Sequence, residues 1–173
     1  YGLLEWINNV TFHWRKECFI MGDSESNVDW YANIIGCYYL STADYAYGLD
    51  TAPLSKARIA SDGEPNFHLY LDDTLIDANG DGVLNGADNG AGIISGSPDL
   101  SAVPFSGAPV SVTTDDPLTA YKKVLSSAGA LRLDAHYAGP LRDELDDLLI
   151  ESVENQESIL VAKDTPVTSD PEE

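Results

Sequence analysis

The side chains best suited to do chemistry in this chain lie between residues 77 and 88, where the sequence reads DANGDGVLNGAD. Carboxylate and amide oxygens recur there at loop positions 1, 3, 5, 9 and 12, and a glycine occupies position 6. Ca²⁺ is a hard cation that binds six to eight oxygens, and a twelve-residue loop with this spacing wraps it well. We therefore predict a calcium loop whose ligands are the side chains of Asp77, Asn79, Asp81, Asn85 and Asp88 and the backbone carbonyl of Val83.

A loop of this composition has two interpretations. The first is a bound calcium that clips the chain together, as single loops of this type more often do than act as switches or catalytic sites. The second is a solvated turn rich in Asn, Gly and Asp that binds no ion. Aspartate rather than glutamate at position 12 resembles the dockerin type of calcium loop more than the sensor EF-hand. Dockerins carry two such loops in tandem and this sequence shows one, so a scaffold-binding role is the weakest interpretation.

The histidines and cysteines form no recognisable metal or nucleophile pattern. His13, His68 and His136 lack metal-ligand spacing to one another or to the cysteines, so we interpret them as structural or solvated. Cys18 and Cys37 could form one disulfide in an exported protein, or Cys37 could be a buried free thiol in its apolar run. The sequence contains no nucleophile elbow, phosphate-binding loop or Cys-x-x-Cys motif.

Composition excludes several classes of function. The 173 residues are 43% hydrophobic and 22% charged, which fits one folded domain or a large part of a bigger one. With 29 acidic and 9 basic residues the net charge is −20, so binding to nucleic acid or to an anionic membrane is disfavoured. No apolar run approaches the roughly 20 residues that span a bilayer. The chain starts at Tyr1 without a signal peptide, so we interpret it as a fragment, a processed product or the ordered part of a longer protein.

The first half has the texture of short strands. Residues 3–13, 30–40 and 67–76 are rich in β-branched and aromatic residues between polar turns. If Asn9, Cys37 and Thr74 are equivalent points, the spacings suit coils of one solenoid with loops of varying length. Alternation of polar and apolar residues is weak, as expected for parallel strands stacked on neighbours.

The second half has the texture of helices. Residues 114–117, which read TDDP, give a start signal with a capping residue, acids in the first turn and a proline where the helix begins, and Gly129 gives a stop. The predicted inward face of this helix comprises Leu118, Tyr121, Val124, Leu125 and Ala128. A second helix is predicted over 140–153, with Leu141, Leu145, Leu148, Leu149 and Val153 facing inward.

These signals divide the chain into five parts. The predicted parts are terminal coils at 1–76 with a long loop at 41–66, the calcium loop at 77–88, extended coil at 89–113, C-terminal helices at 114–160, and an acidic tail at 161–173.

Three motifs resemble one family in the right order. Residues 1–14 read YGLLEWINNVTFHW, residues 33–39 read NIIGCYY, and residues 120–130 read AYKKVLSSAGA. Together they resemble the last coils and C-terminal helix of bacterial pectate lyases. The resemblance implies a mainly β fold, a right-handed parallel β-helix, with C-terminal α-helices packed on it. Cys37 and Thr74 stand where the family's internal asparagine ladder is expected, so a continuous ladder is not implied.

The resemblance also implies a chemistry. Pectate lyases cleave polygalacturonate by β-elimination, in which calcium acidifies a proton that an arginine then removes. The resemblance places that arginine and the catalytic calcium ligands upstream of Tyr1, so no catalytic residue is predicted in this chain. The loop at 77–88 reads as an insertion and not as the catalytic calcium site. The family is secreted, so we expect an extracellular, periplasmic or cell-surface location.

Contacts to an acidic polysaccharide are the remaining expectation. Arg15 and Lys16 follow the first strand and could reach substrate carboxylates. Lys56 and Arg58 lie in the long loop. The alternative for all four side chains is a surface ion pair with the abundant acidic residues. The aromatic residues Trp14, Trp30 and Tyr31 could stack on sugar rings or belong to the core.

Two classes of function follow. The first is the C-terminal part of a secreted, calcium-dependent pectate-lyase-like enzyme, whose partner is the N-terminal part of the same protein. The second is a non-catalytic, calcium-stabilised β-helical module that binds polysaccharide or protein. Only the first requires an arginine cluster upstream of Tyr1.

Overall fold

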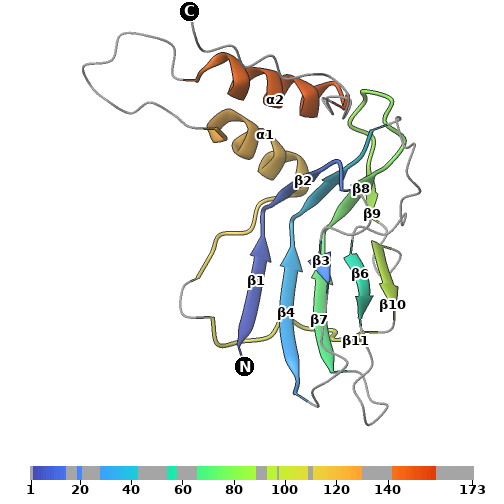
Figure 1. Ribbon diagram of the computed structural model, residues 1–173. Coiled ribbons are helices and arrows are strands. Elements are labelled where there is room, and N and C mark those ends of the chain that lie inside the picture. Colours follow the sequence, from blue (N-terminus) through green and yellow to red (C-terminus); the bar gives the residue numbers. More distant parts are fainter. Residues whose placement is uncertain are drawn as a thin grey trace, which may run out of the picture.

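The structure is a computed structural model that describes residues 2–14, 19–20, 28–42, 54–57, 66–88, 93–96, 98–108, 111–129 and 142–158. Within these residues the chain forms short strands followed by two helices (Figure 1). The strands are β1 (Leu3–Ile7), β2 (Val10–Phe12), β3 (Phe19–Ile20), β4 (Trp30–Ile35), β5 (Tyr38–Leu40), β6 (Leu54–Ala57), β7 (Phe67–Asp72), β8 (Leu75–Asp77), β9 (Ala87–Asp88), β10 (Ile94–Gly96) and β11 (Asp99–Leu100); the helices are α1 (Pro117–Ser127) and α2 (Glu144–Glu154).

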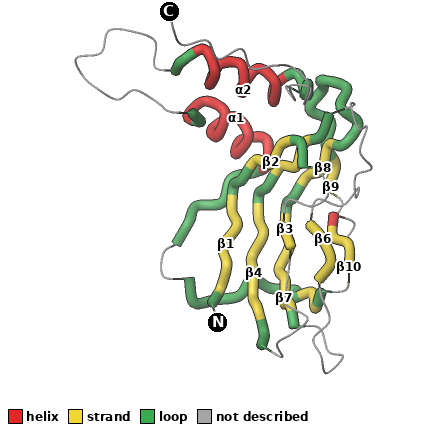
Figure 2. Tube along the Cα trace, viewed as in Figure 1, coloured by secondary structure: helices red, strands yellow, loops and turns green. Residues whose placement is uncertain are grey.

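Three strand pairs, β1–β2, β4–β5 and β7–β8, stack on one another in register (Figures 1 and 2). Their first strands form a sheet in the order β1-β4-β7-β11, and their second strands form a sheet in the order β2-β5-β8-β9. A third sheet has the order β10-β6-β3. All pairings are parallel except β8 with β9. The predicted parallel, mainly β fold is thereby confirmed, and the arrangement is consistent with coils of a β-helix.

Each of the three predicted strands is in fact two strands joined by a two-residue corner. The first corner residue has a positive φ: +58° at Asn8, +64° at Gly36 and +43° at Asp73. Such backbone cannot continue a strand, so the sheet turns there, and glycine, asparagine and aspartate are the residues that tolerate it best. These corners could not be predicted from the sequence, because the residues on both sides of each corner favour strand.

The second corner residues are Asn9, Cys37 and Thr74, and they stack as predicted. The strands that follow them are in register, because Tyr38 pairs with both Val10 and Leu75. Each side chain donates to the carbonyl two residues earlier: Asn9 Nδ2 at 2.9 Å, Cys37 Sγ at 3.4 Å and Thr74 Oγ1 at 3.0 Å. Three different donors therefore fill one structural role.

The core consists of two clusters, one among the strands and one between the second sheet and α1. The larger comprises Trp14, Ala32, Ile34, Cys37, Tyr39, Phe67, Leu69 and Ile93, and the smaller comprises Tyr38, Leu40, Tyr121 and Leu125. Cys37 is a buried free thiol, and burial raises its pKa to about 11, so it is an unreactive core residue. Cys18 lies outside the described residues.

Helix α1 begins where the sequence predicts. Asp116 is its N-cap and accepts from the backbone N–H of Thr119 at 3.0 Å, and Pro117 is the first helical residue. Tyr121 and Leu125 are buried against the strands, as predicted. Leu118, which was predicted to face inward, is 41% exposed.

The inward face predicted for α2 is wrong at three positions and confirmed at one. Leu145, Leu148 and Leu149 are exposed, by 62%, 48% and 42%. Val153 packs toward the smaller core cluster as predicted, together with Ile150, which was not predicted. Leu141 lies outside the described residues. Apolar residues lie on two sides of this helix, and the packing on α1 and β2 selects one of them. Periodicity alone cannot make that choice. Neither helix described is long and apolar enough to cross a membrane.

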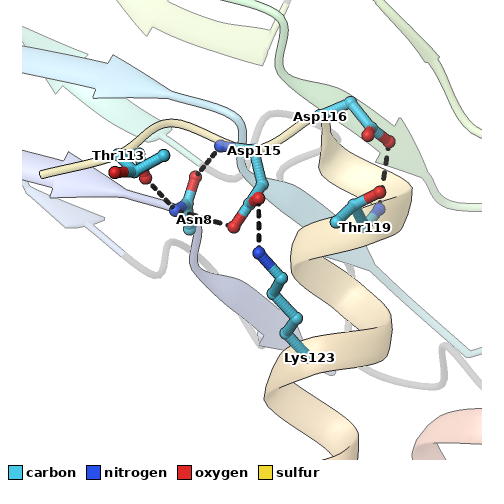
Figure 3. Close-up of polar contacts among 6 residues, drawn as sticks. All are labelled: Asn8, Thr113, Asp115, Asp116, Thr119 and Lys123. Carbon is cyan, nitrogen blue, oxygen red and sulfur yellow. Dashed lines mark hydrogen bonds and ion pairs between the residues drawn. The ribbon is translucent and has the colours of Figure 1, made fainter.

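A strap formed by residues 111–116 ties the strand corners to α1 (Figure 3). Asn8 Nδ2 donates to the Thr113 carbonyl at 2.8 Å, and Asn8 Oδ1 accepts from the Asp115 backbone N–H at 2.9 Å. Lys123 on α1 forms an ion pair with Asp115 at 2.6 Å. The corner at Asn8 is thus hydrogen-bonded to a segment more than 100 residues away, which fixes where α1 begins.

Candidate metal centre

The predicted calcium loop connects β8 to β9. Ile76 pairs with Ala87 and Leu75 with Asp88 in the antiparallel bridge at its base. Asp77, at loop position 1, is therefore the last residue of β8, and Asp88, at position 12, is an exposed residue of β9. At position 6, where a sharp turn is predicted, Gly82 has φ +74°.

Three of the predicted ligand side chains lie together. Asn79 Nδ2 is 2.9 Å from Asp81 Oδ2, and Asn85 Nδ2 is 3.0 Å from the same oxygen. Asn79 Oδ1 also accepts from the Asp81 backbone N–H at 3.3 Å, and Asp81 Oδ1 accepts from that of Val83 at 2.9 Å. These turns, in which a side chain accepts from the backbone two residues on, shape the loop locally.

Asp77 is the buried anchor of the loop, with 2% of its surface exposed. Its Oδ2 accepts from Tyr38 Oη at 3.2 Å, from the Asn85 backbone N–H at 3.1 Å and from Gln156 Nε2 at 3.1 Å. Burial raises the pKa of Tyr38 to about 12, so its hydroxyl remains a donor. Asp77 Oδ1 is buried and has no hydrogen-bond partner among the described residues.

That orphaned oxygen is the observation that tests the fit of a cation. A buried carboxylate oxygen without a partner is unfavourable, and a cation is the ligand that would satisfy it. The Asn79 and Asn85 amides point their nitrogens at Asp81 Oδ2, and a rotation of each amide group would present oxygen instead. The described residues contain no group of three His, Cys, Asp or Glu side chains that could hold a metal. A cation in this loop would therefore have to be held by mixed carboxylate, amide and backbone oxygens, the donor set that Ca²⁺ prefers.

Two residues at this loop were not predicted. Tyr38 comes from β5, and Gln156 follows α2. Besides its bond to Asp77, Gln156 Oε1 accepts from the Gly82 N–H at 3.2 Å. Nothing in the local sequence indicates either contact, because Gln156 lies 79 residues from Asp77 and only the fold brings them together.

The other candidate residues do not gather at the loop. Arg15, Lys16, Arg58 and His136 lie outside the described residues, and Lys56 lies on β6. Of the aromatic candidates, Trp14 is buried in the core, Trp30 is 40% exposed, and Tyr31 stacks on His68 with ring centroids 4.7 Å apart. His13 shares a 2.9 Å hydrogen bond with Thr42.

His68 joins two acidic residues on the outer side of the first sheet. Its Nδ1 is 2.8 Å from Asp99 Oδ2, and its Nε2 is 3.3 Å from Asp29 Oδ1. Burial of the ring lowers the pKa of His68, but hydrogen bonds to Asp99 and Asp29 and their negative charges outweigh it and raise the pKa above 6.5.

We expect this ion pair to make stability depend on pH. A histidine whose pKa is raised by folding contributes fully below its unfolded pKa, and the contribution is lost as pH rises through the folded pKa. Because both carboxylates are largely exposed, the loss between about pH 6 and about pH 9 should be about 1 kcal/mol. Urea unfolding at several pH values measures it, and His68→Gln should flatten the profile. A wild-type profile that is already flat would contradict the expectation.

Known proteins that match the chain share one name. A protein of Aspergillus oryzae named "Probable pectate lyase C" is 34% identical over 159 residues, which is 89% of this chain and 32% of the relative. Proteins of the same name from Neosartorya fischeri and Aspergillus flavus are 32% and 33% identical over the same shares. The chain thus spans about a third of the length of these relatives. No family model matches the chain, and no solved structure does.

The identity runs along nearly the whole chain, from the strand pairs to the helices. The resemblance to pectate lyases indicated by the sequence motifs is therefore confirmed, and the chain is a distant homologue of one part of the fungal pectate lyase C proteins.

Proposed function

We propose that this chain is the C-terminal part of a secreted, calcium-dependent pectate-lyase-like enzyme that cleaves uronate-containing polysaccharide by β-elimination. The observation that carries the proposal is the 34% identity to a probable pectate lyase C over 89% of the chain. The three stacked strand pairs support it, since a right-handed parallel β-helix is built from such coils.

The chain's own part in that activity is structural. In this mechanism an arginine removes the proton beside the substrate carboxylate, and we place that arginine upstream of Tyr1. Among the described residues, strands β1 and β2 each have one neighbouring strand in their sheets, so a further coil could pair with their other edges. We propose that the N-terminal part of the same protein supplies that coil, and that Arg15 and Lys16 contact the acidic polysaccharide.

The experiment is to purify the protein from its source and identify every polypeptide in it by native mass spectrometry and peptide sequencing. The same sample is then assayed on polygalacturonate by the ultraviolet absorbance of the unsaturated product, with and without EDTA. Upstream sequence containing an arginine cluster, together with EDTA-sensitive product formation, is the expected result. If residues 1–173 occur alone and folded, the enzyme proposal fails, and a calcium-stabilised binding module takes its place.

We further propose that Ca²⁺ binds the 77–88 loop as a structural ion. A ligand present at about 100 times its dissociation constant stabilises the native state by about 2.7 kcal/mol. For a chain of this size that corresponds to a fall in Tm of about 5–10 °C on adding EDTA. Differential scanning calorimetry measures it.

Two variants test whether the EDTA-induced fall in Tm comes from the 77–88 loop. Asp81→Asn removes a charged ligand from an exposed side chain, so we expect it to abolish most of the EDTA-induced shift. Glu154→Gln removes an equally exposed charge at the end of α2 and should leave the shift as in the wild type. A Tm that EDTA does not change, or an equal shift in Asp81→Asn, would argue against an ion in this loop.

A further inference from the structure

The chain beyond α2 packs directly on the candidate calcium loop through one side chain. Gln156 is 2% exposed, and its amide contacts three loop residues: Asp77, Gly82 and, through a 3.4 Å bond from Nε2, the carbonyl of the predicted ligand Val83. Nε2 donates to Asp77 Oδ2 at 3.1 Å, and Oε1 accepts from the Gly82 backbone N–H at 3.2 Å. Asp77 is the first predicted ligand, and Gly82 is the residue at the sharp turn, so this amide holds both ends of the ligand-bearing half of the loop.

The backbone at Gln156 favours a different residue. Its φ is +54°, a left-handed conformation that glycine or asparagine usually occupies after a helix. The helix end itself is closed by backbone bonds, from Gln156 N–H to the Val153 carbonyl at 3.3 Å and from Glu157 N–H to the Ser152 carbonyl at 2.9 Å. Glycine would make the same backbone bonds without strain. The contacts of the side chain, and not the closure of the helix, therefore account for a glutamine at this position.

The bond to Asp77 has a directional consequence. Gln156, Tyr38 and Asn85 all contact Oδ2, which leaves the buried Oδ1 without a hydrogen-bond partner among the described residues. A carboxylate fixed through one oxygen presents the other in a defined direction. Hydrogen-bonded partners of this kind orient metal ligands and strengthen metal binding.

We propose that Gln156 is a positioning residue that couples Ca²⁺ binding in the 77–88 loop to docking of residues 155–158 on that loop. The proposal rests on the proposed calcium site. Because coupling between two equilibria is reciprocal, docking raises the affinity for Ca²⁺ by the same factor by which Ca²⁺ favours docking. Bound Ca²⁺ would thereby stabilise the packing of the end of α2 on the last strand pair. Between the two lies an open pocket of about 510 Å³, whose lining includes Gly80, Asp81 and Glu157.

The test uses two variants that suit the left-handed backbone. Gln156→Gly removes the side chain and the strain together, and Gln156→Asn keeps an amide on a side chain that is one methylene shorter. Both should fold, since glycine and asparagine tolerate this conformation. Glu154→Gln, at an exposed position of α2 outside the docked segment, is the control. Calorimetric titration with CaCl₂ gives the affinity, and hydrogen–deuterium exchange follows amides in 77–88 and in 152–157.

We expect both Gln156 variants to bind Ca²⁺ about 10-fold more weakly than the wild type, a typical loss for a partner of a metal ligand. At saturating Ca²⁺ their loop amides should still be protected from exchange, whereas the protection that the ion gives to 152–157 should be lost. Glu154→Gln should behave as the wild type. Wild-type affinity and intact protection of 152–157 in Gln156→Gly would overturn the coupling. If the wild type itself neither binds Ca²⁺ nor shows loop protection, the calcium site fails, and the coupling fails with it.

Discussion

Gly36→Ala is expected to lower the free energy of unfolding by about 3 kcal/mol, from positive-φ strain and broken hydrogen bonds together. Gly36 is the first corner residue between β4 and β5, with φ +64°. A Cβ there would overlap the backbone carbonyl oxygen of Asp115 and stand 3.0 Å from Asn8 Oδ1. Asp115 belongs to the strap, so relief of the overlap must move the strap and break its hydrogen bonds to Asn8 (Figure 3).

The neighbouring corner supplies the control. Asp73 occupies the equivalent position with φ +43° and carries a side chain, so the corner conformation alone does not require glycine. Burial and the negative charges of Asp72, Asp116 and Asp88 raise the pKa of Asp73, so its carboxylate is repelled by its neighbours and its removal relieves that repulsion. Asp73→Ala should therefore change stability by less than about 1 kcal/mol. The free energies of unfolding are measured by urea denaturation. Equal losses of stability in the two variants would mean that the contact between the strap and Gly36 does not account for the effect of Gly36→Ala.

Asp77→Ala is expected to cost about 3 kcal/mol even in the absence of calcium, because each buried donor left without an acceptor costs about 1–3 kcal/mol. The donors are Tyr38 Oη, the Asn85 N–H and Gln156 Nε2. Asp77→Asn should behave differently, because its single oxygen can still accept from them while its charge is gone.

The order of stability between the wild type and Asp77→Asn should therefore depend on calcium. In EDTA the wild type buries a charged carboxylate with one unpartnered oxygen, so Asp77→Asn should be as stable as the wild type or more stable. In saturating calcium the wild type gains binding energy that the amide cannot match, so it should be the more stable by about 2 kcal/mol. Chemical denaturation of both proteins in both buffers measures this. The same order in both buffers would remove Asp77 from the ligand set.

Local chemistry explains what could be predicted from the sequence. The start of α1 follows from Asp116 and Pro117, whose preferences act within one helical turn. The stacking of Asn9, Cys37 and Thr74 could be predicted because each side chain satisfies a carbonyl of its own corner. The convergence of Asn79, Asp81 and Asn85 is likewise decided within a few residues.

Long-range packing decides what could not be predicted. The inward side of α2 depends on α1 and β2, so Leu145 and Leu148 are exposed although they extend the apolar stripe. The corner at Gly36 depends on the strap, which approaches from residues 111–116. Gln156 reaches Asp77 across 79 residues of sequence, and no spacing rule covers such a distance.

The edge strands at the two ends of the stacked sheets differ in length and direction, so the two ends differ in their capacity to pair with a further strand. In the described residues, the sheets begin with the free edges of β1 and β2, five and three residues long. At the far end they finish on the two-residue strands β9 and β11, and β9 runs antiparallel. Short or reversed edge strands are poor templates for further pairing. Within the described residues, the β1 and β2 edges are therefore the better templates for a further coil, whereas the β9 and β11 end terminates the stack.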